Sequence, residues 1–172
     1  MIIYLIGFMG SGKSTAGRKL SARIGWDFID LDAHIEGIYG MSVNTIFNDL
    51  GEESFRDTEA EELRKLSKND KLVLACGGGT PCYGSNMKLM NSTGLTIYLR
   101  LSPAALESRL RGTKNSRPLI KDLEDKELSL YVKNTLEYRE KYYMKSKEIV
   151  EGLNLDLREL LAVLEARNLY IP

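Results

Sequence analysis

Long apolar runs are missing from this 172-residue sequence, and so is any excess of charge of one sign. No segment approaches the roughly 20 apolar residues that a membrane-spanning helix requires, so we expect no membrane partner. Lys and Arg together number 24, as do Asp and Glu. This balance argues against a strongly basic, nucleic-acid-binding protein. Because the pattern shows no obvious exposed apolar stripe, we also expect a monomer.

Cysteine and proline are scarce as well, with two and four residues. Cys76 and Cys82 have neither CxxC spacing nor partner His or Cys residues, which argues against a structural zinc site. We expect both to be small buried side chains of a protein from a reducing compartment, the cytoplasm. The apolar opening, MIIYLIGFMG, lacks a basic flank and is interrupted by glycine, so it predicts a buried strand rather than a secretion signal.

What the sequence does contain is an alternation of short apolar, β-rich segments with helical periodicity. The length fits a single domain over residues 1–172. Strands are predicted at 2–6, 28–31, 71–76, 95–99 and 148–150, and helices at 13–24, 59–66, 103–110, 131–143 and 157–164. Such alternation predicts an α/β fold with a mostly parallel sheet between two helix layers, in which ligands bind beyond the carboxyl ends of the strands.

A phosphate-binding pattern follows the first predicted strand. Gly7-Phe8-Met9-Gly10-Ser11-Gly12-Lys13-Ser14 matches G-x-x-x-x-G-K-[ST] at every specified position. The glycines allow backbone N–H groups to surround phosphate oxygens, and the helix that follows offers unpaired N–H groups and a positive dipole end. Lys13 can reach the β and γ phosphates, and the hydroxyl of Ser14 can hold Mg²⁺. The motif predicts a protein that binds a nucleoside triphosphate.

The remaining motifs narrow the class of phosphate chemistry. The Asn-Lys-x-Asp element of GTPases is missing, because the nearest string, Ser67-Lys68-Asn69-Asp70, has the wrong order and precedes a strand. The Leu-Ser-Gly-Gly signature of ABC-type proteins is missing too, and Gly77-Gly78-Gly79 replaces the usual acid after the third strand. Asp30 and Asp32 end the second predicted strand, so alternation points both carboxylates the same way. They suit a metal site and a proton acceptor, although Asp at a strand end is equally typical of a helix cap.

Three further segments admit both a structural and a functional interpretation. Arg56 and Glu59 form either a surface ion pair or a support that holds the arginine for a carboxylate ligand. Gly77-Gly78-Gly79 is either a tight turn or a place where backbone approaches a ligand. The charged residues 111–126 are either a solvated loop or a mobile lid from which Arg117 reaches a transferred phosphate.

Taken together, these residues resemble the shikimate kinase family over nearly the whole chain. The family's order and approximate spacing are matched by the phosphate loop and by five other motifs: Asp30-x-Asp32, Gly51-Glu52-x-x-Phe55-Arg56-x-x-Glu59, Gly77-Gly78-Gly79, Arg117-Pro118-Leu119 and Arg139-x-x-x-Tyr143. The first motif is generic, whereas the combination is highly specific. The resemblance implies a three-layer α/β/α P-loop kinase fold of the nucleoside-monophosphate-kinase type, with five parallel strands in the order 2-3-1-4-5.

The resemblance also implies the reaction, which is transfer of the γ-phosphoryl group of ATP to the 3-hydroxyl of shikimate, a step of the chorismate pathway, with Mg²⁺ as cofactor. It makes Asp32 the base or orienting group, and Lys13 and Arg117 the groups that neutralise the moving phosphoryl. Ser14 is implied to bind Mg²⁺ directly and Asp30 to bind it through water. The implied ATP contacts are Gly10, Ser11, Gly12, Lys13, Ser14, Thr15 and Arg117, and the implied shikimate contacts are Asp32, Arg56, Gly77, Gly78, Gly79 and Arg139, with a shikimate-binding region at about residues 32–60.

Two positions depart from the family pattern, and two other functions stay open. Where the family often has a lid-side arginine against adenine, this sequence has Leu110 between Arg109 and Arg111, either of which can substitute. The expected adenine-lining loop near residues 152–156 is poorly matched. Gluconate kinase shares the phosphate loop but lacks the joint set of motifs, and a nucleotide-binding regulator would bind ATP without turnover. The single histidine, His34, matches no catalytic position, so we expect it to face solvent.

Overall fold

The computed structural model describes residues 1–113, 120–151 and 157–170. Its strands form one sheet and are β1 (Ile2–Ile6), β2 (Asp27–Asp30), β3 (Leu72–Ala75), β4 (Gly94–Arg100) and β5 (Glu148–Glu151). Their order is β2-β3-β1-β4-β5, and all neighbouring strands are parallel. The predicted α/β class and the implied strand order are therefore confirmed.

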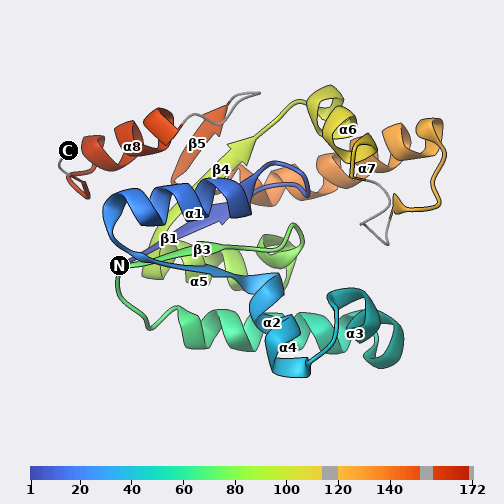
Figure 1. Ribbon diagram of the computed structural model, residues 1–172, viewed down its shortest axis with the longest axis horizontal. Coiled ribbons are helices and arrows are strands. Elements are labelled where there is room, and N and C mark those ends of the chain that lie inside the picture. Colours follow the sequence, from blue (N-terminus) through green and yellow to red (C-terminus); the bar gives the residue numbers. More distant parts are fainter. Residues whose placement is uncertain (114–119, 152–156, 171–172) are drawn as a thin grey trace.

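Helices cover both faces of this sheet, which gives the three layers visible in Figure 1. One face carries α1 (Lys13–Ile24) and α8 (Leu157–Ala166). The other carries α4 (Glu52–Leu66), α5 (Asn86–Thr93) and α7 (Asp125–Tyr143). The short helices α2 (Leu31–Tyr39) and α3 (Val43–Leu50) pack beside α4, and α6 (Pro103–Arg111) packs beside α7.

The central strand β1 explains why the N-terminal segment is apolar throughout. All of its residues are fully buried. Ile2, Tyr4 and Ile6 contribute to the core beneath α4, α5 and α7, whereas Ile3 and Leu5 contribute to the core beneath α1 and α8. A central parallel strand is covered on both faces, so it requires an uninterrupted apolar run rather than alternation.

Several helices differ from the sequence-based expectation. The helix predicted at 13–24 has these bounds in the structure, whereas the helix predicted at 59–66 begins earlier, at Glu52. Apolar periodicity did not indicate α2, α3 or α5, which are short and leave much of their surface exposed, nor the turn η1 (Thr80–Cys82). Periodicity is a weak signal in a helix of two turns, where only a few positions face the core.

The segment 111–126 is described only in part, because residues 114–119, with Arg117, lie outside the described residues. In the part that follows, Ile120 is fully buried in the core, and α7 begins at Asp125. At least this end of the segment is thus packed and is not a solvated loop. Within the described ranges, no helix is long and apolar enough to cross a membrane.

Candidate active site

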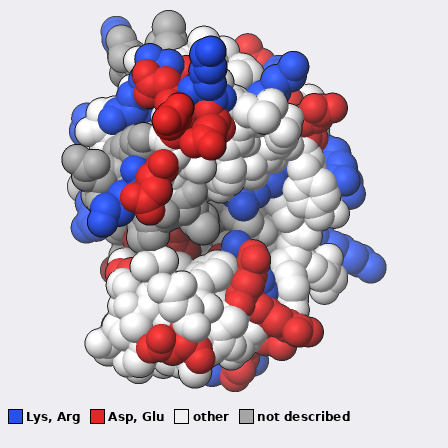
Figure 2. Space-filling model, turned by 90° about the vertical axis from the view of Figure 1, so that its right-hand side faces the viewer, with Lys and Arg blue, Asp and Glu red and all other residues white. Residues whose placement is uncertain are grey.

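A cavity of about 430 Å³ opens beyond the carboxyl ends of β1, β2 and β3. Its walls come from the phosphate loop, the start of α2, the glycine segment after β3 and the end of α6. Figure 2 views the molecule from this end and shows a hollow across its middle with basic side chains inside it. This is the edge of the sheet at which a parallel α/β fold binds its ligands.

The phosphate loop surrounds the start of α1 with backbone groups. Gly12 precedes that helix with φ of 96° and no side-chain cap, so the first N–H groups of α1 are left for a ligand. Gly7 is needed for a different reason, since a Cβ atom built on it would lie 2.8 Å from the carbonyl oxygen of Leu99. The ammonium of Lys13 donates to the carbonyl oxygens of Gly7 and Phe8, at 3.0 and 2.9 Å. The predicted loop residues therefore meet at one anion-binding surface.

Ser14 and Asp30 meet at the floor of the same cavity. The Ser14 hydroxyl donates to Asp30 Oδ2 at 2.5 Å. The other carboxylate oxygen of Asp30 accepts from the backbone N–H of Ala33 at 3.3 Å and so caps α2. Both interpretations of this aspartate, as a helix cap and as a site residue, are compatible with the structure. A hydroxyl and a carboxylate beside a phosphate loop fit Mg²⁺, which typically takes one or two protein oxygens and completes its shell with phosphates and water.

Asp32 lines the cavity from helix α2 and not from the end of strand β2. The prediction that Asp30 and Asp32 both end β2 is wrong, because the strand stops at Asp30 and Asp32 lies in the first turn of α2. Burial, and then the carboxylates of Glu59 and Asp30, raise the pKa of Asp32 to about 6, against the opposing effect of nearby cationic groups. A carboxylate that titrates near neutrality is suited to accept a proton from a hydroxyl group.

A buried ion pair lies next to Asp32. The carboxylate of Glu59, which is 0% exposed, accepts from Arg56 Nη1 at 2.7 Å and from the hydroxyl of Thr80 at 2.5 Å. The Arg56 guanidinium also lies over the rings of Phe47 and Phe55, at 5.6 and 5.2 Å. This pair is therefore no surface ion pair but a support that holds the arginine in one place. The sequence analysis did not single out Thr80, whose only signal is a hydroxyl directly after three glycines.

The glycine segment 77–79 lets three charged groups approach the backbone. A Cβ atom built on Gly77 would lie 2.7 Å from Asp32 Oδ1, and one built on Gly78 would lie 3.0 Å from Arg139 Nη1. On Gly79 it would lie 2.5 Å from Arg56 Nη2. Side chains at these positions would displace the charged groups, so the glycines are needed for this packing. The segment is also a turn, because the N–H of Thr80 bonds to the carbonyl oxygen of Gly77. The close approach of a ligand to it stays a prediction. The predicted substrate residues Asp32, Arg56 and Arg139 are brought together around this segment.

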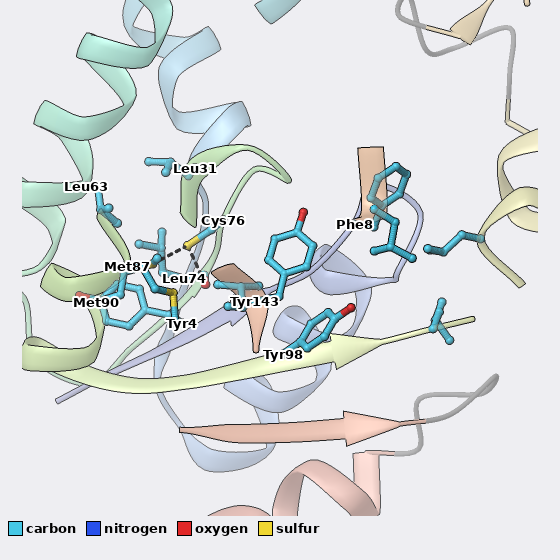
Figure 3. Close-up of a cluster of buried hydrophobic side chains, with 14 of the residues drawn as sticks. Tyr4, Phe8, Leu31, Leu63, Leu74, Cys76, Met87, Met90, Tyr98 and Tyr143 are labelled. Atoms are coloured by element: carbon cyan, nitrogen blue, oxygen red, sulfur yellow. Dashed lines mark hydrogen bonds between the residues drawn. The ribbon is translucent and has the colours of Figure 1, made fainter. Parts of the chain in front are cut away.

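A second cavity, of about 500 Å³, borders the same segment, and we call it the acceptor-side cavity. Arg56 and Arg139 contribute two cationic groups to its lining, together with Gly79 and the half-buried Cys82. Burial is the main cause that raises the pKa of Cys82 to about 11. The other cysteine, Cys76, is buried beside Met90 in the core, as predicted (Figure 3).

The two arginines near the end of α6 have different surroundings. Arg109 lines the first cavity and donates through Nη1 to the carbonyl oxygens of Gly10 and Ser11, both at 3.3 Å. Arg111 pairs with Glu107 at 2.6 Å and with Asp125 at 3.5 Å. The structure therefore brings Arg109, and not Arg111, to the phosphate loop. The adenine-lining loop expected near 152–156 lies outside the described residues.

The single histidine is less exposed than expected. His34 Nε2 lies 2.9 Å from Glu62 Oε2, and the His34 side chain is 32% exposed. The expectation that it faces solvent is thus only half right, because the carboxylate on α4 draws the ring against that helix.

Comparison with known proteins finds relatives over almost the entire chain. A family model described as shikimate kinase matches residues 9–164. A shikimate kinase from Parabacteroides distasonis is 40% identical over 144 residues, covering 84% of this chain and 83% of the relative. The crystal structure of shikimate kinase from Bacteroides thetaiotaomicron has a TM-score of 0.92 at 34% identity and covers 96% of this chain and 98% of its own.

A second solved structure adds a bound ligand to this comparison. The shikimate kinase from Acinetobacter baumannii, in complex with shikimate, has a TM-score of 0.87 at 30% identity, covering 98% of this chain and 95% of its own. The sequence matches, the fold and the motifs gathered at the cleft lead to the same assignment. This chain belongs to the shikimate kinase family.

Proposed function

We propose that this protein transfers the γ-phosphoryl group of ATP to the 3-hydroxyl of shikimate and releases ADP and shikimate 3-phosphate. Membership of the shikimate kinase family supports the reaction, and a solved relative in complex with shikimate supports the acceptor. The observation that carries the proposal is the meeting of a phosphate loop, a proton-accepting carboxylate and two arginines at the glycine segment 77–79. Shikimate is a small hydroxylated carboxylate, so the two arginines suit its carboxylate and Asp32 suits its 3-hydroxyl.

On the phosphate side, the backbone N–H groups of residues 10–15 surround the phosphates of ATP, and Lys13 turns from the loop carbonyls to the β and γ phosphates. Mg²⁺ would be held directly by the Ser14 hydroxyl and through water by Asp30, and it would supply positive charge for the phosphate oxygens. We assign Arg117 to the transferred phosphoryl group, from a lid at about 111–126. Arg109, which already contacts the loop, is our choice for the adenine side.

On the acceptor side, Asp32 takes the proton of the 3-hydroxyl of shikimate. The oxygen of that hydroxyl bonds to the γ phosphorus, and the bond from this phosphorus to the departing ADP oxygen breaks. Arg56 and Arg139 bind the carboxylate of shikimate, and the glycine segment allows the ring to lie close to the backbone. The Arg56 guanidinium is already held by Glu59, so little side-chain freedom is lost when the carboxylate binds.

The broader setting follows from the same features. We infer a single domain over 1–172, with the acceptor region at about 32–60, that acts as a monomer in the cytoplasm. The balanced charge and the sparse thiols support this inference. Elution at the mass of two chains in size-exclusion chromatography would contradict the inference that the protein is a monomer.

The test is coupled ADP release with Mg-ATP, comparing shikimate, gluconate and no acceptor. We expect stimulation by shikimate alone. Stimulation by gluconate would indicate the gluconate kinase alternative, and ATP binding with a flat response to both would indicate the regulator. In equilibrium binding, Arg56→Ala should weaken shikimate binding by roughly 2–4 kcal/mol, because a charge-assisted pair is lost. Unchanged affinity in that variant would remove Arg56 from the acceptor site.

A further inference from the structure

Tyr143, the last residue of α7, lies wholly inside the protein beneath the glycine segment. Its hydroxyl donates a hydrogen bond to the carbonyl oxygen of Gly78 at 2.6 Å. Its ring packs against the ring of Tyr98, with 5.0 Å between the ring centroids (Figure 3). Burial, as the main cause, raises the pKa of Tyr143, so the hydroxyl keeps its proton and stays a donor.

The carbonyl oxygens of the glycine segment are all engaged inside the protein. That of Gly77 accepts from the N–H of Thr80 at 3.2 Å, and that of Gly79 accepts from the N–H of Cys82 at 2.9 Å. Both bonds are local and belong to the turn that follows. The carbonyl of Gly78 is different, because its partner is a side chain 65 residues away in sequence. The peptide between Gly78 and Gly79 is therefore the one whose orientation depends on tertiary structure.

The turn from Gly77 to Thr80 spans this peptide, but the Tyr143 hydroxyl is the described group that bonds to the peptide itself. Glycine flanks it on both sides, and glycine restricts the backbone angles less than any other residue. In a trans peptide the N–H points away from the C=O, and no described peptide bond is cis. With the Gly78 carbonyl turned toward the buried hydroxyl, the N–H of Gly79 is turned away from the core. Within the described chain, no group accepts a hydrogen bond from the N–H of Gly78 or Gly79.

We propose that Tyr143 is a positioning residue for the acceptor, because its hydroxyl holds the Gly78–Gly79 peptide with the N–H available to an acceptor oxygen. Gly79 lines the acceptor-side cavity with Arg56 and Arg139, so this donor adds a hydrogen bond beside the two cationic groups. Arg139, one helical turn before Tyr143, lies against the same glycine segment. One end of α7 thus presents a contact to the acceptor and orients a second one. The identity of the acceptor rests on the proposed function.

The test compares Tyr143→Phe with Tyr98→Phe. Each variant removes one hydroxyl from the same buried ring pair, but the Tyr98 hydroxyl lies beside the carboxylate of Glu140 and makes no hydrogen bond to the glycine segment. We expect Tyr143→Phe to raise the dissociation constant and the KM of shikimate about fivefold, which is the change in affinity that the loss of one neutral hydrogen bond produces. The KM of ATP should stay unchanged, and kcat should stay within about twofold. Amide exchange at Thr80 and Cys82, whose N–H groups bond to the carbonyl oxygens of Gly77 and Gly79, should become faster in this variant when it is measured without ligands. Tyr98→Phe should change none of these values.

The outcomes separate this role from a merely structural one. Unchanged shikimate affinity in a folded Tyr143→Phe protein would overturn the proposal, as would equal weakening of shikimate and ATP. Similar effects of the two substitutions would also overturn it. If shikimate failed to stimulate the unmodified protein, the proposed function would fail, and amide exchange at Thr80 and Cys82 would still decide whether Tyr143 holds the peptide.

Discussion

The phosphate side and the acceptor side of the cleft are built in different ways. The phosphate side comes from one continuous stretch between β1 and α1, and Lys13 donates to the carbonyl oxygens of Gly7 and Phe8 within that stretch. The acceptor side collects Asp32 from α2, Arg56 from α4, the glycines after β3 and Arg139 from α7. A local motif carries its geometry within itself, whereas an assembled site depends on packing between distant segments.

The two sides also differ in how their charges are buried. Ser14 and Asp30 are partly exposed and line an open cavity. Glu59 is fully buried and Asp32 is half-buried, and the Glu59 carboxylate disfavours ionisation of Asp32. We therefore expect substitutions on the phosphate side to change the rate and leave folding intact. Substitutions on the acceptor side should change stability as well.

The largest effect on rate is expected from Lys13→Ala. Loss of the ammonium that neutralises the developing phosphate charge should lower kcat by about 10³-fold. Because Lys13 is held by two loop carbonyls at a partly exposed position, the free energy of unfolding should change little. Coupled ADP release and urea denaturation measure the two quantities, with Lys19→Ala on the exposed face of α1 as the control. A loss below tenfold would contradict the role of Lys13.

The largest effect on stability is expected from Glu59→Ala. It leaves the Arg56 guanidinium, whose side chain is 14% exposed, without its closest anionic partner. Breaking such a buried pair from one side should lower the free energy of unfolding by about 3 kcal/mol. Glu52→Ala is the matched control, because Glu52 pairs with the same arginine at 3.5 Å but is 68% exposed. Urea unfolding should show almost no change for the control, and equal losses would mean that burial does not set the difference.

Protonation of Asp32 should make both the activity and the stability of the protein depend on pH. Its pKa is raised from 3.8 to about 6, so the folded protein binds this proton more tightly than the unfolded chain does. The stabilising contribution of the protonated form is complete below pH 4 and is lost as pH rises through 6. Above that pH, Asp32→Asn should raise the free energy of unfolding by about 2 kcal/mol. Urea denaturation of the unmodified protein and of Asp32→Asn at pH 5 and pH 8 tests this prediction. The increase in the free energy of unfolding should be smaller at pH 5, and an increase of equal size at the two pH values would contradict the prediction.

The same proton should appear in the kinetics of the unmodified protein. If Asp32 accepts the hydroxyl proton, kcat/KM for shikimate should fall about tenfold per pH unit below pH 6. A pH–rate profile from 5 to 8, with ATP saturating, measures it. A flat profile across this range would mean that Asp32 orients the hydroxyl and does not take its proton.

The smallest effect is expected from Gly79→Ala. The added methyl group would press on the Arg56 guanidinium, at 2.5–2.8 Å, and should weaken shikimate binding by about 1 kcal/mol with ATP binding unchanged. Gly37→Ala is the control, since nothing lies within 4 Å of a Cβ atom built there. Calorimetric titration of both variants would show whether the acceptor side tolerates less change than a helix surface.

Local chemistry explains which features the sequence analysis reached and which it missed. The strands were predicted because buried parallel strands are short apolar runs, and α1 was predicted because Leu20 and Ile24 lie four residues apart in the segment after the phosphate loop. Helices α2 and α3 were missed because each buries only one or two residues. The error at Asp32 has the same origin, because α2 begins without a loop between it and β2 and Asp30 serves as its cap. The strand order came from the resemblance to a family, not from the alternation of elements.

The sequence by itself determined the phosphate loop, since glycine spacing and a lysine at the start of a helix specify that geometry within a few residues. It also contained every motif of the acceptor side, but the residues alone did not decide between a structural and a functional interpretation of these motifs. Arg56 and Glu59 could have been a surface pair, and three glycines could have been a turn with no charged group against it. Only the tertiary structure decided these cases, because burial of Glu59, contact of Gly79 with Arg56 and the bond from Tyr143 to Gly78 join residues that are far apart in the chain. Such contacts exist only once the helices have packed against the sheet, and that packing gives each charge its solvent exposure and its partner.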